Sequence, residues 1–194
     1  MAQFGLFENA NELDGFRYQA AFIDRAVEEL LIARVRELPF EEFDFHGFKG
    51  KRRVVSFGWK YEYAGRGELR KAEEIPEFLF PLRSRAASFA KVDEDAFQHV
   101  LVAEYGPGAG IGWHRDKAVF GQVVGVSLLS ACTLRFRREV NTKWERINIL
   151  AEPRSAYHLS GPARSEWEHS ILRVDALRYS ITFRSLVTAA EKVR

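Results

Sequence analysis

Apolar residues recur at helical spacing in two stretches of the N-terminal half. Residues 20–38 carry apolar side chains three or four positions apart, at Phe22, Ile23, Ala26, Val27, Leu30, Leu31, Val35 and Leu38. Residues 76–91 carry a similar stripe, at Phe78, Leu79, Leu82, Ala86 and Phe89. This spacing predicts two amphipathic helices. Pro39 ends the first, and Pro81 leaves the start of the second open.

From residue 98 onward the pattern changes to short, β-branched or alternating stretches separated by Gly, Pro or charged residues. Seven stretches are expected to be strands: 98–105, 122–130, 132–139, 146–152, 155–161, 169–174 and 177–187. A further β segment, 52–64, is expected to carry one row of side chains on one side, namely Val55, Phe57, Trp59, Tyr61 and Tyr63. Two helices followed by many short strands predict an α+β protein. Its C-terminal half would be a double-sheet jelly roll, with the N-terminal helices packed on one sheet.

The composition is that of an ordinary globular protein, with 46% hydrophobic and 29% charged residues among 194. No apolar run approaches the roughly 20 residues that span a bilayer, and the first residues do not resemble a signal peptide. The single cysteine, Cys132, excludes an intrachain disulfide and argues against a thiolate zinc site. We therefore expect a cytoplasmic monomer that does not contact membranes.

The net charge of +2 is too small to predict nucleic-acid binding by itself. The basic residues are nevertheless clustered in two places, within 49–53 (KGKRR) and within 135–138 (RFRR). Each cluster could bind phosphates or could be solvated surface, and the sequence leaves both possibilities open.

A histidine and an aspartate lie two positions apart in the glycine-rich sequence GAGIGWHRD, as His114 and Asp116. On a strand both side chains would point to the same face, where they could be two of three ligands of a metal ion. His158 and His169 are the candidates for the third ligand, because both lie in later β segments. Two histidines and one carboxylate form the facial triad of non-haem Fe(II) oxygenases, which leaves coordination positions open for a cosubstrate and O₂.

The expected strand RYSITFR (178–184) alternates polar and apolar side chains. Its polar face carries Arg178, Ser180, Thr182 and Arg184. Buried guanidinium groups are costly unless they meet anions, and arginine can bind a carboxylate through two hydrogen bonds. 2-Oxoglutarate has two carboxylates and a keto oxygen that can chelate iron, so this pattern favours it as the cosubstrate. A solvent-facing edge strand is the alternative interpretation.

Taken in order, the segments YGPGAGIGWHRD, WEH and RYSITFR resemble the AlkB family of Fe(II)/2-oxoglutarate-dependent dioxygenases, which oxidatively remove alkyl groups from nucleic-acid bases. The resemblance covers roughly residues 50–186 and implies a double-stranded β-helix core with Fe(II), 2-oxoglutarate and O₂ as cofactors. It also implies that His114, Asp116 and His169 are the iron ligands and form the catalytic centre.

The resemblance further assigns four residues to the cosubstrate. Arg178 would pair with the carboxylate of 2-oxoglutarate that lies far from the iron, supported by the hydroxyl of Tyr105. Arg184 would lie near the carboxylate on the metal side. Ser180 stands where many members of the family have asparagine, and its hydroxyl can still donate a hydrogen bond.

Two positions depart from the family pattern. Ala103 stands where many members have an asparagine that contacts the cosubstrate, and its loss removes one hydrogen bond, about 1 kcal/mol. Ala118 stands where some members carry an acid that helps to read the base. The first departure should weaken 2-oxoglutarate binding, and the second leaves the choice of base open.

By this resemblance the protein would be an oxidative demethylase that repairs DNA or RNA, removing N-alkyl lesions such as 1-methyladenine and 3-methylcytosine. The target base must leave its stack to reach the iron. Five residues are expected to contact this substrate: Trp59, Tyr61, Tyr63, Arg138 and Arg164. Two alternatives remain, namely the same oxygenase chemistry on a protein or small molecule, and a non-catalytic nucleic-acid-binding scaffold.

Nothing in the sequence suggests a linker or an internal repeat, so we expect a single dioxygenase domain over residues 1–194. Within it, residues 1–48 would be an N-terminal helical extension. Residues 49–95 would form a nucleotide-recognition lid and the second helix, and residues 96–188 the jelly-roll catalytic core.

Overall fold

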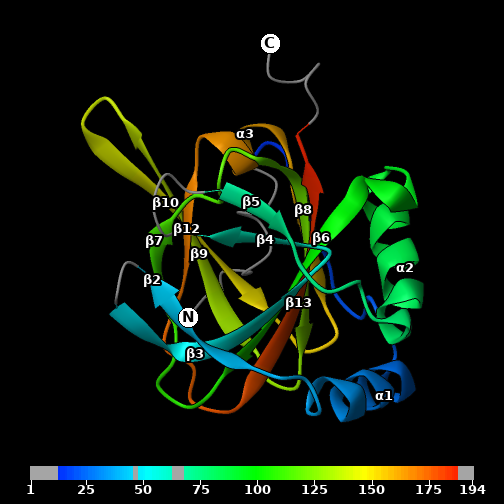
Figure 1. The fold of residues 1–194 in the computed structure, drawn as a ribbon. Helices are drawn as coiled ribbons and strands as arrows, with labels where there is room; N and C mark the ends of the chain where they lie inside the picture. The colour runs from blue at the N-terminus through cyan, green and yellow to red at the C-terminus, as the bar shows by residue number, and fades with distance from the viewer. Residues whose placement is uncertain (1–12, 46–47, 63–67, 188–194) are drawn as a thin grey trace.

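The computed structural model describes residues 13–45, 48–62 and 68–187 (Figure 1). Its main element is a seven-stranded antiparallel sheet with the strand order β1-β11-β8-β13-β6-β3-β2. In that order the strands are β1 (Phe16–Gln19), β11 (Ala156–Leu159), β8 (Phe120–Leu128), β13 (Arg178–Leu186), β6 (Phe97–Tyr105), β3 (Phe48–Phe57) and β2 (Glu41–Phe45). We call it the major sheet.

A four-stranded antiparallel sheet, the minor sheet, faces the major one. Its strands are, in order, β10 (Lys143–Ala151), β9 (Cys132–Val140), β12 (Glu168–Ile171) and β7 (Ile111–His114). A separate two-stranded ribbon consists of β4 (Trp59–Glu62) and β5 (Glu68–Lys71). From β6 to β13 the chain alternates between the two large sheets, except at the β9–β10 hairpin, which stays within the minor sheet. This is the topology of a jelly roll. The fold class expected from the sequence is therefore confirmed.

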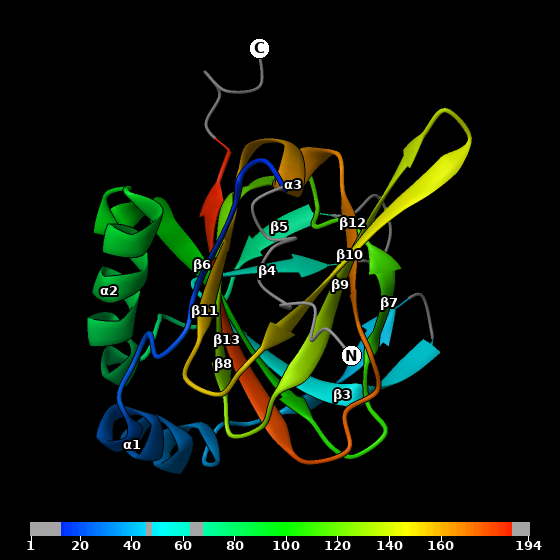
Figure 2. The same cartoon turned by 180° about the vertical axis from the view of Figure 1, so that it is seen from behind.

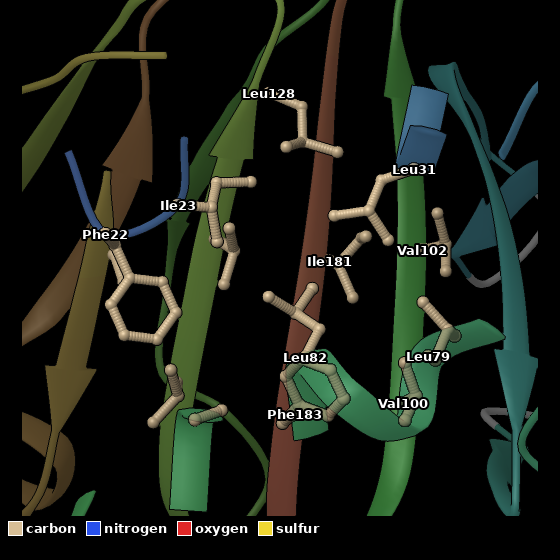
Figure 3. Packing of buried hydrophobic residues seen from close by; sticks show 14 of the residues in the cluster. Phe22, Ile23, Leu31, Leu79, Leu82, Val100, Val102, Leu128, Ile181 and Phe183 are labelled. Atoms are coloured by element: carbon tan, nitrogen blue, oxygen red, sulfur yellow. The ribbon is translucent and has the colours of Figure 1, made fainter. Parts of the chain in front are cut away.

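Helices α1 (Arg25–Val35) and α2 (Phe80–Ala90) cover the outer face of the major sheet, and Figures 1 and 2 show them on the side of the molecule away from the minor sheet. Figure 3 shows Leu31 and Leu82 packed toward Val100 and Ile181 of the sheet. Short 3₁₀ turns precede α2 (Glu77–Leu79) and β6 (Glu94–Ala96), and a one-turn helix, α3 (Gly161–Ser165), precedes β12. No helix in the described part of the chain is long and apolar enough to cross a membrane.

The first helix is shorter than its apolar pattern predicted. It begins at Arg25 because Asp24 caps it, accepting a hydrogen bond from the Val27 N–H at 2.8 Å. Phe22 is buried in the same core but lies before the helix. Leu30, expected in the apolar stripe, is 70% exposed, so that expectation was wrong. The second helix agrees better, since Pro81 lies in its first turn, where a missing N–H costs nothing.

The β segment expected over 52–64 is divided in two. Gly58 adopts φ +73°, a left-handed conformation that suits glycine, and the chain leaves the major sheet there. Phe57 is buried under the helices, whereas Trp59 and Tyr61 belong to the two-stranded ribbon. The expectation of one continuous row of side chains was therefore wrong. Tyr63 lies outside the described residues.

Candidate metal centre and cosubstrate face

Two residues of the predicted triad, His114 and His169, come from neighbouring strands of the minor sheet. His114 is the last residue of β7, and it is paired directly with His169 of β12. Asp116 follows in the next loop rather than on the strand, which corrects the expectation that a strand aligns both side chains. One ligand atom from each of the three residues lies within 4.8 Å of the others. This set of donors fits a metal ion of the facial-triad type.

His158, the other candidate for the third ligand, is bound elsewhere. It is buried in β11, where its Nδ1 lies 3.0 Å from Nη2 of Arg17 and its Nε2 lies 2.8 Å from Oε1 of Gln122. Because the arginine can only donate, Nδ1 is the acceptor and Nε2 carries the proton. Both ring nitrogens are therefore used within the protein, and His169 is the third member of the cluster.

The protonation states of the cluster suit a metal ligand set. Burial lowers the pKa of His169 to about 3 and also lowers that of His114, so both rings are neutral at pH 7. His114 Nδ1 lies 3.0 Å from the Gly112 carbonyl oxygen, and donating there leaves the lone pair on Nε2. Burial alone would raise the pKa of Asp116, but the nearby charge of Arg184 holds it well below its ordinary value.

Arg184 holds Asp116 in place. It lies on β13 of the opposite sheet, and its Nε and Nη2 both donate to Oδ1 of Asp116, at 3.2 and 2.9 Å. Arg184 was expected beside the metal-side carboxylate of the cosubstrate. In the structure its strongest contact is with the aspartate of the triad, next to the metal position.

The inner face of the major sheet carries the polar residues expected to bind the cosubstrate. Arg178 is 1% exposed and lies over the ring of Tyr105, with its Cζ 5.0 Å from the ring centroid. Its Nη2 donates to Ser127 Oγ at 2.9 Å, whereas its Nε and Nη1 have no hydrogen-bond partner. A buried guanidinium with two vacant donors is expensive unless an anion binds there. This arrangement fits one carboxylate of 2-oxoglutarate.

The register of the sheet gives the neighbours of this arginine. Ser180 lies between Ala103 and Ser127 on the adjacent strands. It is two residues after Arg178 on β13 and faces the same side of the sheet. Ser180 is 5% exposed, as expected of a residue inside the jelly roll. Ala103 offers no polar atom there, so the serine hydroxyls are the polar groups of this row.

Sequence reasoning missed one residue on this face, Tyr157 of β11. Tyr157 pairs with Gly125 of β8, and Gly125 pairs with Thr182 of β13 on its other side. A Cβ atom added to Gly125 would collide with the far end of the Tyr157 ring, including the hydroxyl. The ring therefore lies across Gly125 toward the strand that carries Arg178. The glycine within the strand pattern VVGVS was the available signal.

The residues expected to bind substrate divide into two groups. Trp59 and Tyr61 lie on β4, and the Nζ of Lys117 lies 5.3 Å from the centroid of the Tyr61 ring. Because Lys117 follows Asp116 by one residue, this contact places the β4–β5 ribbon beside the loop that carries the aspartate. The role of the ribbon as a lid over the metal centre stays a prediction.

Arg138 and Arg164 both make hydrogen bonds within the protein. Arg138 donates to Glu166 and Glu145, at 2.8 and 3.0 Å, so its charge is already balanced. Arg164 donates to three main-chain carbonyl groups, those of Lys117, Phe120 and Gly121. It therefore secures the loop after Asp116, and its assignment to substrate binding stays a prediction.

A family model described as the 2OG-Fe(II) oxygenase superfamily matches residues 19–184. One curated relative, "Alkylated DNA repair protein ALKBH8 homolog" of Arabidopsis thaliana, is 28% identical over 160 residues, which are 70% of this chain and 46% of that protein. The chain thus spans less than half of that relative. "Uncharacterized protein L905" of Acanthamoeba polyphaga mimivirus is 26% identical, over 96% of this chain and 91% of the viral protein.

Two solved structures share the fold. The structure of OsALKBH1 matches with a TM-score of 0.67 and 16% identity, over 88% of this chain and 96% of that one. A prolyl-4-hydroxylase from Pseudomonas putida matches with a TM-score of 0.58 and 15% identity, over 95% and 100%. Identities this low show the fold alone. The ALKBH names of one relative and one structure agree with the resemblance found in the sequence motifs.

Proposed function

The chain belongs to the 2OG-Fe(II) oxygenase superfamily, and from this we propose that it removes N-alkyl groups from nucleic-acid bases by oxidation. Its cofactor is Fe(II), and 2-oxoglutarate and O₂ are its cosubstrates. The observation that carries the chemistry is the triad of His114, Asp116 and His169 together with the buried, partly unpaired guanidinium of Arg178. The nucleic-acid substrate is supported by the ALKBH-named relative and by the aromatic ribbon beside the Asp116 loop.

The residues divide the work of this reaction among them. The triad would hold the iron through one face, and Arg178 would bind a carboxylate of 2-oxoglutarate in a region from which water is largely excluded. Iron and 2-oxoglutarate, when bound, supply the oxidation of a C–H bond by O₂. Arg184 keeps Asp116 ionised and oriented, and Arg164 secures the adjoining loop. Trp59 and Tyr61 would stack on a base flipped out of its strand.

The product chemistry follows from the substrate. Hydroxylation of an N-methyl carbon gives a hemiaminal, which releases formaldehyde and leaves the unmodified base. The protein has only to place the methyl carbon beside the iron and to exclude water. Ala118 leaves the base-reading position without an acid, so we make no choice among 1-methyladenine, 3-methylcytosine and similar lesions.

The decisive experiment is turnover on defined oligonucleotides. The protein is loaded anaerobically with Fe(II) and 2-oxoglutarate, mixed with oligonucleotides that carry 1-methyladenine or 3-methylcytosine, and exposed to air. Mass spectrometry should show the loss of one CH₂ from the oligonucleotide and the formation of succinate. Asp116→Ala should abolish both products. Asp175→Ala, which changes an exposed aspartate in the loop between β12 and β13, should retain them.

The other outcomes are informative as well. Succinate without loss of the methyl group would contradict the nucleic-acid substrate and would favour an oxygenase that acts on a protein or small molecule. A protein that binds iron but forms neither product would favour the non-catalytic scaffold. The expected cytoplasmic location and monomeric state remain predictions.

A further inference from the structure

The outer face of the minor sheet carries a continuous stack of arginine and tryptophan side chains. Side chains alternate along a strand, so the residues next to the inward-facing His114 and Phe136 point outward. On β7 and β9 these are Trp113, Arg135 and Arg137. The guanidinium carbons of Arg135 and Arg137 lie 4.7 and 4.5 Å from the centroid of the Trp113 ring.

A second indole extends the stack to the edge of the sheet. The guanidinium carbon of Arg137 lies 4.2 Å from the ring centroid of Trp144 on β10, so this arginine contacts two indoles. Trp144 itself is 40% exposed. We call the four residues Trp113, Arg135, Arg137 and Trp144 the Arg–Trp face. Figure 2 shows β9 and β10 on the side of the molecule away from the helices.

The two arginines are held rigidly. Arg135 Nε donates to Ser170 Oγ at 3.0 Å, and Arg137 Nε donates to Glu168 Oε2 at 2.6 Å. These bonds use the Nε groups, so the terminal nitrogens at the end of each side chain can still bind a phosphate. Stacking and hydrogen bonding together fix the guanidinium planes before any ligand arrives, which lowers the entropic cost of binding.

The surroundings of the Arg–Trp face are basic. Arg146 of β10 is exposed and lies opposite Arg137 in the register. A hollow of about 660 Å³ adjoins Arg135; its lining includes Lys51, Arg173 and the glycine-rich stretch 108–112, and no acidic residue. Five cations thus stand against the two outward-facing acids of β9 and β12, Glu139 and Glu168. A polyanion would be attracted to this surface.

The same surface also carries exposed apolar side chains. Six large hydrophobic side chains are exposed in the described part of the chain, and three of them lie on or beside this sheet: Trp144, Leu150 and Leu172. Leu172 also lines the hollow. These side chains add apolar contact area for a ligand beside the fixed cations.

We infer that the Arg–Trp face and the adjoining hollow bind a single-stranded nucleic acid, outside the metal centre. Surfaces that hold single strands combine cations for the phosphates with aromatic rings for the bases, and both are present in alternation here. The choice of a nucleic acid rests on the proposed function. Trp113 precedes His114, and Glu168 precedes His169, so the bound nucleic acid would lie on the opposite face of the minor sheet from the metal position. It would reach the metal position around β7, the edge strand of that sheet.

The test is binding of unmodified oligonucleotides to the full chain loaded anaerobically with Fe(II) and 2-oxoglutarate. The probes are fluorescent oligothymidylate and oligouridylate of about 12 nucleotides, a length within the usual range for single-strand sites. Three variants are compared: Trp144→Ala, the double variant Arg135→Gln/Arg146→Gln, and the matched control Arg25→Gln/Arg34→Gln. The control removes the same charge from α1, where both arginines are largely exposed.

For Trp144→Ala we expect affinity to fall by about fivefold or more, as when one base loses a stacking partner. In a salt titration, the Arg135→Gln/Arg146→Gln variant should reduce the slope of log K against log salt by about 1.4, since each phosphate contact to a single strand contributes roughly 0.7. The control should bind within twofold of the wild type. Thermal unfolding of each variant checks that the fold is retained.

Three results would overturn the inference: no binding by the wild type, equal losses in the control and the face variants, or an unchanged salt slope. Demethylation measured in parallel separates this inference from the proposed function. If the wild type demethylates and the face variants bind normally, the binding role of the Arg–Trp face is contradicted and the proposed function is supported. If the protein binds through the Arg–Trp face but does not demethylate, the binding surface is supported and the proposed reaction is contradicted.

Discussion

Arg178 and Arg184 lie at opposite ends of the same inward-facing row of β13, and their surroundings differ in one respect. Arg184 donates two hydrogen bonds to Asp116, so its charge is compensated within the protein. Arg178 is more deeply buried, yet two of its nitrogens lack a partner. A charge left uncompensated in the interior costs several kcal/mol. The uncompensated charge of Arg178 therefore destabilises the folded protein, and a bound carboxylate would relieve this destabilisation.

Tyr157 should take part in binding that carboxylate. Burial raises the pKa of its hydroxyl well above the ordinary value, so the group stays protonated and can donate. We expect Tyr157→Phe to raise the KM for 2-oxoglutarate about tenfold or more, because a hydrogen bond to a charged acceptor contributes about 1.5–3 kcal/mol. Succinate formation at varied 2-oxoglutarate concentrations measures the effect.

A matched control exists on the other face of the same sheet. The hydroxyl of Tyr179 donates to Glu104 at 3.1 Å, outside the jelly-roll interior. Tyr179→Phe removes the same atom and should leave the KM for 2-oxoglutarate within twofold of the wild type. Equal KM values for Tyr157→Phe and the wild type would show that the hydroxyl does not reach the cosubstrate.

At the scale of the elements, Gly58 decides where the chain leaves the major sheet and enters the β4–β5 ribbon. Its φ of +73° is strained for other residues, and an added Cβ would collide with the main-chain oxygen of Gln98. Gly58→Ala should lower the free energy of unfolding by about 2 kcal/mol or more. Urea denaturation measures this change.

Gly106→Ala is the matched control, since a Cβ there meets no atom within 4 Å. Its stability should change by less than about 0.5 kcal/mol, as for most surface substitutions. If both variants were equally stable, Gly58 would not be the residue that requires this turn.

The long strands could be predicted from the sequence because alternation and turn residues are local signals. The nine-residue strands β6, β8, β9, β10 and β13 all overlap the segments in which the pattern placed strands. The four-residue strand β1 was missed, since so short a segment shows too little alternation to recognise. The division at Gly58 was also missed, because a single glycine fits a strand or a break equally well.

The site was predictable in its residues but not in its contacts. His114, Asp116 and His169 could be named because their types and order are distinctive. That β7 ends at His114, with Asp116 held from the opposite sheet by Arg184, depends on contacts between residues far apart in sequence. The same holds for Arg164, whose three carbonyl acceptors lie more than 40 positions away.

On the scale of the whole molecule, the two faces of the jelly roll have different roles. The helices bury the outer face of the major sheet, whereas the outer face of the minor sheet remains exposed with its stacked arginines and indoles. The metal position lies between the sheets, and its two histidines belong to the same minor sheet whose outer face is exposed. The molecule is thus asymmetric, with helices packed on one side and an exposed cationic surface on the other.

The stability of the whole molecule should depend on pH through His158, which connects three strands of the major sheet. Burial lowers its pKa from 6.5 to about 4, with the charge of Arg17 acting in the same direction. As the pH falls below 6.5, His158 becomes protonated in the unfolded chain but stays neutral in the folded protein. The free energy of unfolding should therefore decrease by about 1.4 kcal/mol per pH unit from this residue, down to about pH 4.

Urea denaturation of the metal-free protein at pH 8, 6 and 5 would measure this dependence, and His158→Gln isolates it. The variant should be less stable at pH 8 because it loses contacts with Arg17 and Gln122. Its decline between pH 6 and 5 should nevertheless be shallower than that of the wild type by about 1.4 kcal/mol per pH unit. The buried rings of His99, His114 and His169 also have lowered pKa values, so the variant keeps a residual slope. Parallel curves for the two proteins would mean that His158 accepts its proton equally well in the folded and unfolded chains.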